Sequence, residues 1–158
     1  MDLVRGRIGR ASLGGGPNPS RSTQRESGMP TQAEMVGRID QHMRDLVAGD
    51  EEAFRAFVAD DFIQDWPQTG ERLRGRQACL NVARNYPGGP PRIEVRRISG
   101  EGDHWVVEGR ITYGDDSVYH AVAILETRDG TLVHEVDYFG PDYPALGWRA
   151  QWVERIPD

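Results

Sequence analysis

The chain has 158 residues, of which 37% are hydrophobic and 28% charged, as is typical of one soluble globular domain. Its net charge of -6 and its lack of any apolar run near the roughly 20 residues of a membrane helix argue against nucleic acid and membrane as partners. The single cysteine, Cys79, excludes an internal disulfide and is compatible with the cytoplasm, where we expect the protein.

Residues 1–30 differ in composition from the rest of the chain. Residues 1–28 contain five arginines against two acidic residues, are rich in Gly, Ser and Pro, and show no apolar periodicity. We predict a disordered tail, or an extension that precedes a true start at Met29. All nineteen basic residues are arginine, which we interpret as the coding bias of a GC-rich bacterial genome. The folded domain is predicted over residues 31–158.

Three helices are predicted near the start of this domain. Thr31 and Glu34 have the spacing of a capping box, and apolar residues at helical spacing follow until Gly49. Asp50 can cap a second helix over residues 51–61, and residues 76–86 form a third. Because Cys79 lies on the apolar face of the third helix, we expect a core residue there.

Strands are predicted over residues 62–66, closed by Pro67 and Gly70, and then over four segments with period-two alternation: 92–98, 104–113, 118–126 and 132–139. The turns between the last four are short enough for antiparallel neighbours. The order of helix, helix, strand, helix and four strands indicates an α+β fold with the helices on one face of a sheet. Residues 118–126 are apolar on both faces, so we expect a second subunit to cover the other face in a homodimer.

Four segments of the sequence resemble, in their order and spacing, the nuclear transport factor 2-like superfamily and its SnoaL-like polyketide cyclase branch: LVAGDEEAFRAFVADDF, WPQTGERLRG, TRDGTLVHEVDYF and WRAQWVE. The resemblance covers about residues 31–154. It implies a cone-shaped, curved, mixed or antiparallel sheet wrapped around three N-terminal helices, with a pocket for a small hydrophobic molecule at the open end. Members include ketosteroid isomerases, scytalone dehydratase, limonene epoxide hydrolase, polyketide cyclases and non-catalytic binding domains, so the fold alone does not fix the function.

The residues of a ketosteroid isomerase are not matched here. By this resemblance Trp66 stands at the position of the base, His42 at that of the oxyanion tyrosine, and Val122 roughly at that of the protonated aspartate. Steroid isomerase activity is therefore not expected. We predict that Trp66 forms pocket wall and that Asp65, one residue earlier in the strand, faces away towards water.

Glu135 and Asp137 are the first candidates for acid/base chemistry. They lie two residues apart and share a strand face with Val133 and Phe139, while the opposite face is also largely apolar, with Leu132, His134, Val136 and Tyr138. The resemblance implies that the Glu135–Asp137 face lines the pocket, where desolvation raises a carboxyl pKa. We place Asp137 first because it is nearer to Phe139. The alternative is a solvated strand face.

Two histidines are further candidates. The spacing of His42 from Met35, Ile39 and Leu46 points it inward, either as a core histidine or into the pocket. His120 shares a face with Val122, so it lines the pocket in one register and lies in the dimer interface in the other.

We expect Trp66, Val122, Phe139 and Trp148 to contact the ligand. The segment that contains Trp148 and Trp152 either closes the mouth of the cone or packs as an ordinary C-terminal segment. Glu108 and Arg110 are either a surface ion pair or, with Asp137, an analogue of the charged trio of epoxide hydrolases. No metal-site spacing, phosphate loop or nucleophile elbow is present, and no cofactor is expected.

These observations indicate a cofactor-independent isomerase, cyclase or dehydratase acting on a small hydrophobic molecule. Asp137 would be its acid or base, assisted by His42, His120 and Glu135. The alternative is a ligand-binding or dimerisation module without chemistry. An epoxide-hydrolase-like activity is a third hypothesis.

Overall fold

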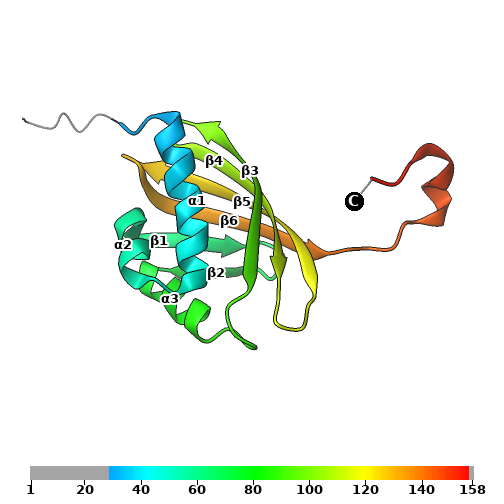
Figure 1. The fold of residues 1–158 in the computed structure, drawn as a ribbon, viewed down its shortest axis with the longest axis horizontal. Coiled ribbons are helices and arrows are strands. Elements are labelled where there is room, and N and C mark those ends of the chain that lie inside the picture. Colours follow the sequence, from blue (N-terminus) through cyan, green and yellow to red (C-terminus); the bar gives the residue numbers. More distant parts are fainter. Residues whose placement is uncertain (1–28, 157–158) are drawn as a thin grey trace, which may run out of the picture.

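The computed structural model of the protein describes residues 29–156, so the predicted tail lies almost entirely outside the described residues. Within this range three helices lie on one side of a six-stranded sheet (Figure 1): α1 Gln32–Ala48, α2 Glu51–Phe57 and α3 Arg76–Arg84. The strands are β1 Val58–Trp66, β2 Glu71–Arg74, β3 Arg92–Glu101, β4 His104–Thr112, β5 Val118–Arg128 and β6 Thr131–Pro141, and a short 3-10 helix, η1 Gly147–Trp152, follows.

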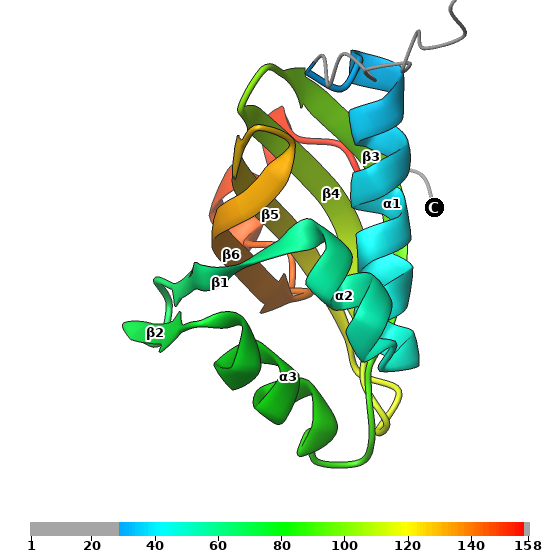
Figure 2. The same ribbon diagram turned by 90° about the vertical axis from the view of Figure 1, so that its left-hand side faces the viewer.

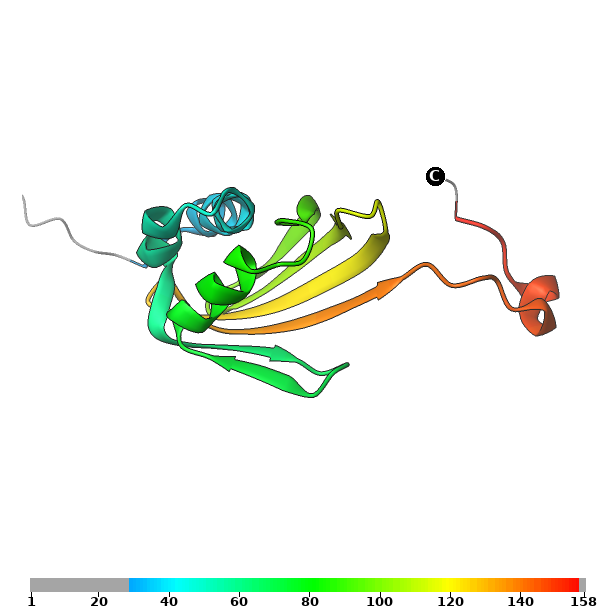
Figure 3. The same ribbon diagram turned by 90° about the horizontal axis from the view of Figure 1, so that it is seen from below.

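The sheet is mixed and open. Its strand order is β2-β1-β6-β5-β4-β3, in which β1 runs parallel to β6 and every other neighbouring pair is antiparallel. Figures 2 and 3 show that the sheet curves and that the helices lie within its concave side. The predicted α+β class and curved sheet are confirmed, although β2 and β3 leave two free edges.

Capping residues mark the boundaries of α1 and the start of α2, as predicted. Thr31 and Glu34 form the capping box at the start of α1, and Gly49 ends it in the left-handed conformation with φ 69°. Asp50 then caps α2, accepting a hydrogen bond of 3.0 Å from the amide of Ala53.

Two element boundaries differ from the prediction. The second helix ends at Phe57, because the extended Val58 is buried and pairs with Leu132 of β6. The segment Glu71–Arg74, expected to be part of a turn, forms β2 and pairs antiparallel with the end of β1. Its polar, exposed side chains gave no strand periodicity.

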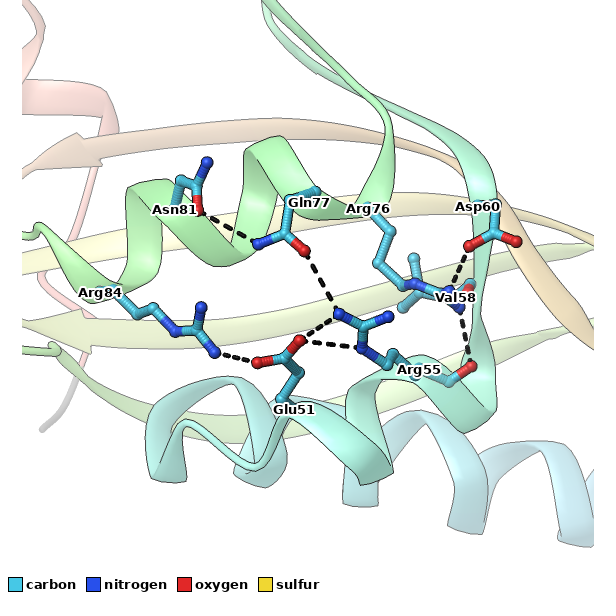
Figure 4. Close-up of polar contacts among 8 residues, drawn as sticks. All are labelled: Glu51, Arg55, Val58, Asp60, Arg76, Gln77, Asn81 and Arg84. Carbon is cyan, nitrogen blue, oxygen red and sulfur yellow. Dashed lines mark hydrogen bonds and ion pairs between the residues drawn. The ribbon is translucent and has the colours of Figure 1, made fainter.

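A polar network attaches α3 to α2 and to the start of β1 (Figure 4). Glu51 accepts hydrogen bonds from Arg55 and from Arg84 of α3. Arg76 donates to the carbonyl oxygens of Arg55 at 3.0 Å and Val58 at 2.8 Å, and it forms an ion pair with Asp60. These contacts fix α3 over the concave side of β1.

The core lies between the helices and the concave face of the sheet. Ile39, Leu125 and Leu132 are completely buried there, and Trp105 nearly so. Along β5 the inward side chains are Tyr119, Ala121, Ala123 and Leu125, whereas Val118, His120, Val122 and Ile124 are exposed on the outward, convex face. The helices thus cover one face of β5, as expected, and leave the other uncovered in the protomer.

An irregularity at the start of β6 changes which residues share a face. Leu132 pairs with Thr127, but His134 already pairs with Glu126, so one extra residue lies between the two pairs. Leu132 and Glu135 therefore both face inward. The expectation that Leu132 lies opposite to Glu135 was wrong for this reason.

Candidate functional site

Two carboxyl groups lie together on the concave face of β6. Glu135 is 6% exposed and stands opposite Leu125, while Asp137 is half-buried and stands opposite Ala123. On the other side β1 runs parallel and places Gln64 beside Glu135. The two acids are therefore enclosed by neighbouring strands on both sides.

Hydrogen bonds fix one oxygen of Asp137. Its Oδ2 accepts from Gln64 Nε2 at 2.7 Å and from Trp66 Nε1 at 3.1 Å. Gln64 Oε1 in turn accepts from the thiol of Cys79 on α3 at 3.1 Å, which orients the amide. Cys79 of α3 is thereby linked through Gln64 of β1 to the carboxylate of Asp137 on β6.

The surroundings shift the pKa values of both acids. Burial raises the pKa of Glu135 well above its ordinary value, and the charge of Asp137 raises it further. Burial also raises the pKa of Asp137, but hydrogen bonds from Glu135, Gln64 and Trp66 oppose that rise by favouring its ionised form. The arrangement favours one proton on Glu135 and a negative charge on Asp137.

A strip of small residues extends from the acids along the concave face. Ala123 pairs with Asp137, Ala121 with Phe139, and Gly109 of β4 with Ala121, and all three small residues are half-buried. Because their side chains are minimal, these three residues fill little space above the sheet.

A tyrosine cluster stands at the far end of this strip. Tyr119 is in edge contact with Tyr113 at 5.0 Å between ring centroids, and Tyr113 stacks on Tyr86 at 5.5 Å. Burial and a hydrogen bond with Tyr86 raise the pKa of Tyr113, so its hydroxyl keeps its proton. Tyr119 and Ala123 are four positions apart in β5, which is about 13 Å along a strand.

His42 is placed inward, as predicted, but away from the two acids. It is 3% exposed and lies between the rings of Phe54 at 5.2 Å and Phe57 at 5.3 Å. Its Nδ1 has no hydrogen-bond partner among the described residues, and burial lowers the pKa of His42 to about 4.

His120 and Val122 do not face the concave side. Tyr119 and Leu125 turn inward, so strand alternation places both residues on the convex face. His120 Nε2 lies 2.7 Å from Asp142 Oδ1 there. The expectation that Val122 lines the cone was wrong, and of the two registers left open for His120 the one that faces the pocket is not formed. An apolar pattern on both faces does not reveal which face is inner.

Of the aromatic side chains expected to contact the ligand, two lie on the concave side and one lies far from it. Trp66 faces inward and holds Asp137, and Phe139 is half-buried opposite Ala121. Trp148 is 72% exposed in a segment that extends beyond the end of the sheet (Figure 3). The expectation that it lies across the mouth of its own cone was wrong for the protomer.

The other charged candidates lie on the outward face. Asp65 faces away from the concave side, as predicted, and Arg72 holds it through two hydrogen bonds of 2.5 and 2.6 Å. Glu108 pairs with Arg97 of β3. Strand alternation places Glu108 and Arg110 on the opposite face from Asp137, so the trio of an epoxide hydrolase is not assembled.

Sequence reasoning missed Gln64 and the tyrosine cluster. Gln64 shares its strand face with Trp66, two residues later, and that alternation could have identified it. The tyrosines come from the loop after α3, the loop after β4 and from β5, so only the fold brings them together.

Two surface hollows lie away from the acids. A groove of about 780 Å³ between α1 and α2 is lined by His42 and Phe57, among others, and a hollow of about 280 Å³ lies beside Trp105. Neither includes Glu135 or Asp137. We place the candidate site on the concave strip because the shifted pKa values and the fixed carboxylate are found there.

Two further observations concern the described residues. Within residues 29–156 no three His, Cys, Asp or Glu side chains gather as a metal site would need. No helix of this part of the chain is long and apolar enough to cross a membrane.

An open, curved, mixed sheet with helices on its concave side defines an α+β protein of the nuclear transport factor 2-like fold. The chain belongs to the SnoaL-like domain family, whose profile matches residues 39–135. No curated protein is significantly similar to it in sequence.

Solved structures agree with this assignment. An NTF-2 like protein of unknown function from Burkholderia xenovorans is 40% identical over 78% of this chain and 95% of that chain, with a TM-score of 0.68. A protein named as a candidate ketosteroid isomerase from Kribbella flavida is 29% identical over 78% of this chain and 90% of that chain, with a TM-score of 0.71. An LEH-like epoxide hydrolase of M. tuberculosis, 20% identical over 70% of this chain and 86% of that chain, shares the fold with a TM-score of 0.60.

Proposed function

We propose that the protein is a cofactor-independent acid/base catalyst, an isomerase, cyclase or dehydratase, that acts on a small hydrophobic molecule bound on the concave strip. The observation that carries this proposal is the pair of acids on the concave face, Glu135 buried and Asp137 half-buried: burial raises both pKa values, while Gln64 and Trp66 hold one oxygen of Asp137. A carboxylate that is both fixed and poorly solvated is suited to removing a proton from carbon.

The two acids have different roles in this proposal. Asp137 is the base, and its Oδ1 atom, which neither Gln64 nor Trp66 holds, takes the proton from a carbon next to a carbonyl group. Glu135 keeps its own proton beside the reacting atoms and can return one to the product. The tyrosine cluster, about 13 Å away along the strand, binds a distant polar end of the molecule and orients it.

The likeness to the Kribbella flavida protein supports proton transfer of this kind, but steroid isomerisation is not proposed. Trp66 stands where the resemblance places the isomerase base, and its indole N–H donates to Asp137. In this proposal the base therefore lies on β6, and not on β1.

Exchange of carbon-bound hydrogen in D2O tests the proposal without knowledge of the substrate. We expect the protein to accelerate deuterium incorporation next to the carbonyl of 2-tetralone, followed by NMR, and Asp137→Asn to reduce that rate by about 100-fold or more. Asp65→Asn is the matched control and keeps the rate, because Asp65 faces the opposite side of the sheet. Equal rates for Asp137→Asn and the unmodified protein would refute the role of Asp137.

The second candidate is a binding module without chemistry. It is favoured by the aromatic side chains of Trp66, Phe139 and Tyr119 around the small strip, which suit a flat ligand with or without a reaction. Saturable binding of 2-tetralone without exchange, together with carboxyl titrations of Glu135 and Asp137 near about 4, would establish this function instead.

A further inference from the structure

The groove between α1 and α2, which we call the α1–α2 groove, lies away from the concave strip. Its lining comes mainly from one face of α1, from α2 and from the turn that joins β5 to β6, and it includes none of the acids or tyrosines of the candidate site. Figure 2 shows α2 beside the second half of α1. The volume of about 780 Å³ lies within the range of about 300–1,000 Å³ that is usual for small-molecule sites. The groove is therefore large enough for a ligand of its own.

Asp45 of α1 places a buried carboxylate in this groove. Its side chain is 8% exposed, and Gln41 Nε2 donates to its Oδ1 at 2.6 Å. Arg44 donates to Gln41 Oε1 at 3.1 Å, which leaves the amide nitrogen of Gln41 for Asp45. No arginine or histidine of residues 29–156 forms an ion pair with Asp45. Because a buried carboxylate has lost hydration, Asp45 favours a cation in the groove.

His42 lies three positions earlier on α1 and also lines the groove, with 3% of its surface exposed. Its Nδ1 is buried without a hydrogen-bond partner among the described residues. Burial lowers the pKa of His42 to about 4, so the ring is neutral at neutral pH and can accept a hydrogen bond. Cβ atoms three positions apart on a helix are about 5–6 Å from each other. One ammonium or guanidinium group can therefore donate to both His42 and Asp45.

The rest of the groove provides an apolar wall and open space. The lining residues of α2 are apolar: Ala53, Ala56 and Phe57. A Cβ atom at Gly37 of α1 would meet nothing within 4 Å, so the groove is open at this position. The guanidinium carbon of Arg38 lies 5.3 Å from the centre of the Phe57 ring. Arg38 and Asp45 are seven positions apart, about 10 Å along a helix, so a cation at Asp45 is separated from that guanidinium.

We propose that the α1–α2 groove binds a small organic cation, an amine or guanidine with an apolar body. Asp45 Oδ2 pairs with the charged group, His42 accepts a second hydrogen bond from it, and the apolar body packs against α2 beside Phe57. With His42 neutral, the lining carries three carboxylates and one guanidinium, a net charge of -2, which favours a cation over an anion. The proposal is independent of the chemistry on the concave strip, because the two sites share no residue.

Phenethylamine and 2-phenylethanol provide the first test, because they have the same apolar body and differ in the ammonium group. In NMR titrations of the full chain, we expect phenethylamine to shift the amide signals of Gly37 and Ala53 and to bind with a Kd of about 1 mM or lower. We expect 2-phenylethanol to bind at least about 10-fold more weakly. Equal affinities, no binding of phenethylamine at about 10 mM, or shifts confined to the concave strip overturn the proposal.

Substitutions on α1 test the two polar contacts. Asp45→Asn keeps the size of the side chain and removes its charge, so we expect the Kd of phenethylamine to rise by about 10-fold or more. His42→Leu removes the acceptor and is expected to raise the Kd by about 5–10-fold. Asp40→Asn is the matched control and keeps the Kd within about 2-fold, because Asp40 lies on α1 outside the groove and pairs with Arg44. An unchanged Kd for Asp45→Asn overturns the proposal. The comparison of the two compounds uses the unmodified protein, so it decides the proposal even where a variant does not fold.

The five arginines of residues 1–28 are rival cations, because the chain continues from this segment into Pro30, which lines the groove. A variant with all five replaced by serine distinguishes the two occupants. We expect it to bind phenethylamine with the Kd of the unmodified protein. Binding that appears only in this variant would assign the groove to the chain's own N-terminal segment and overturns the small-molecule proposal.

Discussion

Burial assigns different roles to two acids that are only two residues apart. Glu135 has lost almost all contact with water, whereas Asp137 retains two fixed donors from β1. Burial therefore favours the protonated form of Glu135, while the hydrogen bonds to Asp137 favour its ionised form. The raised pKa of Glu135 lowers the stability of the protein at neutral pH.

Glu135→Gln is expected to stabilise the protein above about pH 5. The folded pKa of Glu135 lies above its ordinary value of 4.5, so the native state holds a proton that the unfolded state releases. Stability is therefore lost as pH rises from the unfolded pKa through the folded one. We expect Glu135→Gln to raise the unfolding free energy at pH 8 and to leave it unchanged at pH 4, measured by urea unfolding. A variant less stable than the unmodified protein at pH 8 would contradict this account.

His42→Leu tests the neutral core histidine. The pKa of His42 falls from 6.5 to about 4 in the folded state, so only the unfolded state takes up a proton between those values. Stability is then lost as pH falls from 6.5 towards 4. Between pH 7.5 and pH 5 this uptake lowers the free energy of unfolding by about 2 kcal/mol. We expect His42→Leu to abolish that decrease.

The control for this experiment is Met43→Leu, which changes a buried side chain of the same helix without removing an ionisable group, so the unfolding free energy keeps its dependence on pH. If the unfolding free energy of His42→Leu depends on pH as that of the unmodified protein does, another group is responsible for the pH dependence.

At the scale of elements, close backbone approaches shape the concave strip. A Cβ atom at Gly109 would lie 2.6 Å from the carbonyl oxygen of Glu94, next to the register shift between β3 and β4. Gly109→Ala must therefore move one strand and is expected to cost about 1–3 kcal/mol of unfolding free energy. Gly37→Ala in α1, where a Cβ meets nothing within 4 Å, is expected to gain about 0.5–1 kcal/mol. Thermal unfolding of both variants checks the contrast in sign.

Local chemistry explains which elements the sequence could predict. Thr31, Gly49 and Asp50 act within a few residues of themselves, so the capping pattern located α1 and the start of α2. Val58 instead becomes a strand residue through Leu132, far along the chain, and β2 exists only because β1 lies beside it. Pairings of this kind leave no local pattern to read.

The part of the candidate site that lies on a single strand could be predicted from the sequence. Glu135 and Asp137 share a face by alternation alone, and the resemblance supplied the direction of that face. His120 could not be placed, because β5 is apolar on both sides and its phase depends on packing against the helices. Gln64 was overlooked because a neutral amide becomes informative only when its partners are known.

At the scale of the whole molecule, the proposed catalytic site and the proposed cation site lie in different parts of the fold. The acids lie on the concave face of the sheet, while the α1–α2 groove lies between two helices and shares no residue with them. Neither proposal therefore depends on the other.

Asp45→Asn is accordingly expected to keep the deuterium-exchange rate within about 3-fold of the unmodified protein, because Asp45 lines the groove and only a group positioned beside the reacting atoms changes a rate by about 100-fold. The measurement is the 2-tetralone exchange at equal protein concentration. A loss as large as that of Asp137→Asn would mean that the two sites are coupled.

The parallel pairing of β1 with β6 has a consequence for biosynthesis. The hydrogen bonds from Gln64 and Trp66 to Asp137 join positions 73 and 71 residues apart, so they are among the last to become possible as the chain emerges from the ribosome. Until then both acids remain hydrated, with the ordinary acidity of a free peptide. The proposed catalytic site is therefore completed in the same late step that completes the sheet, and a nascent chain that ends before β6 lacks both of its acids.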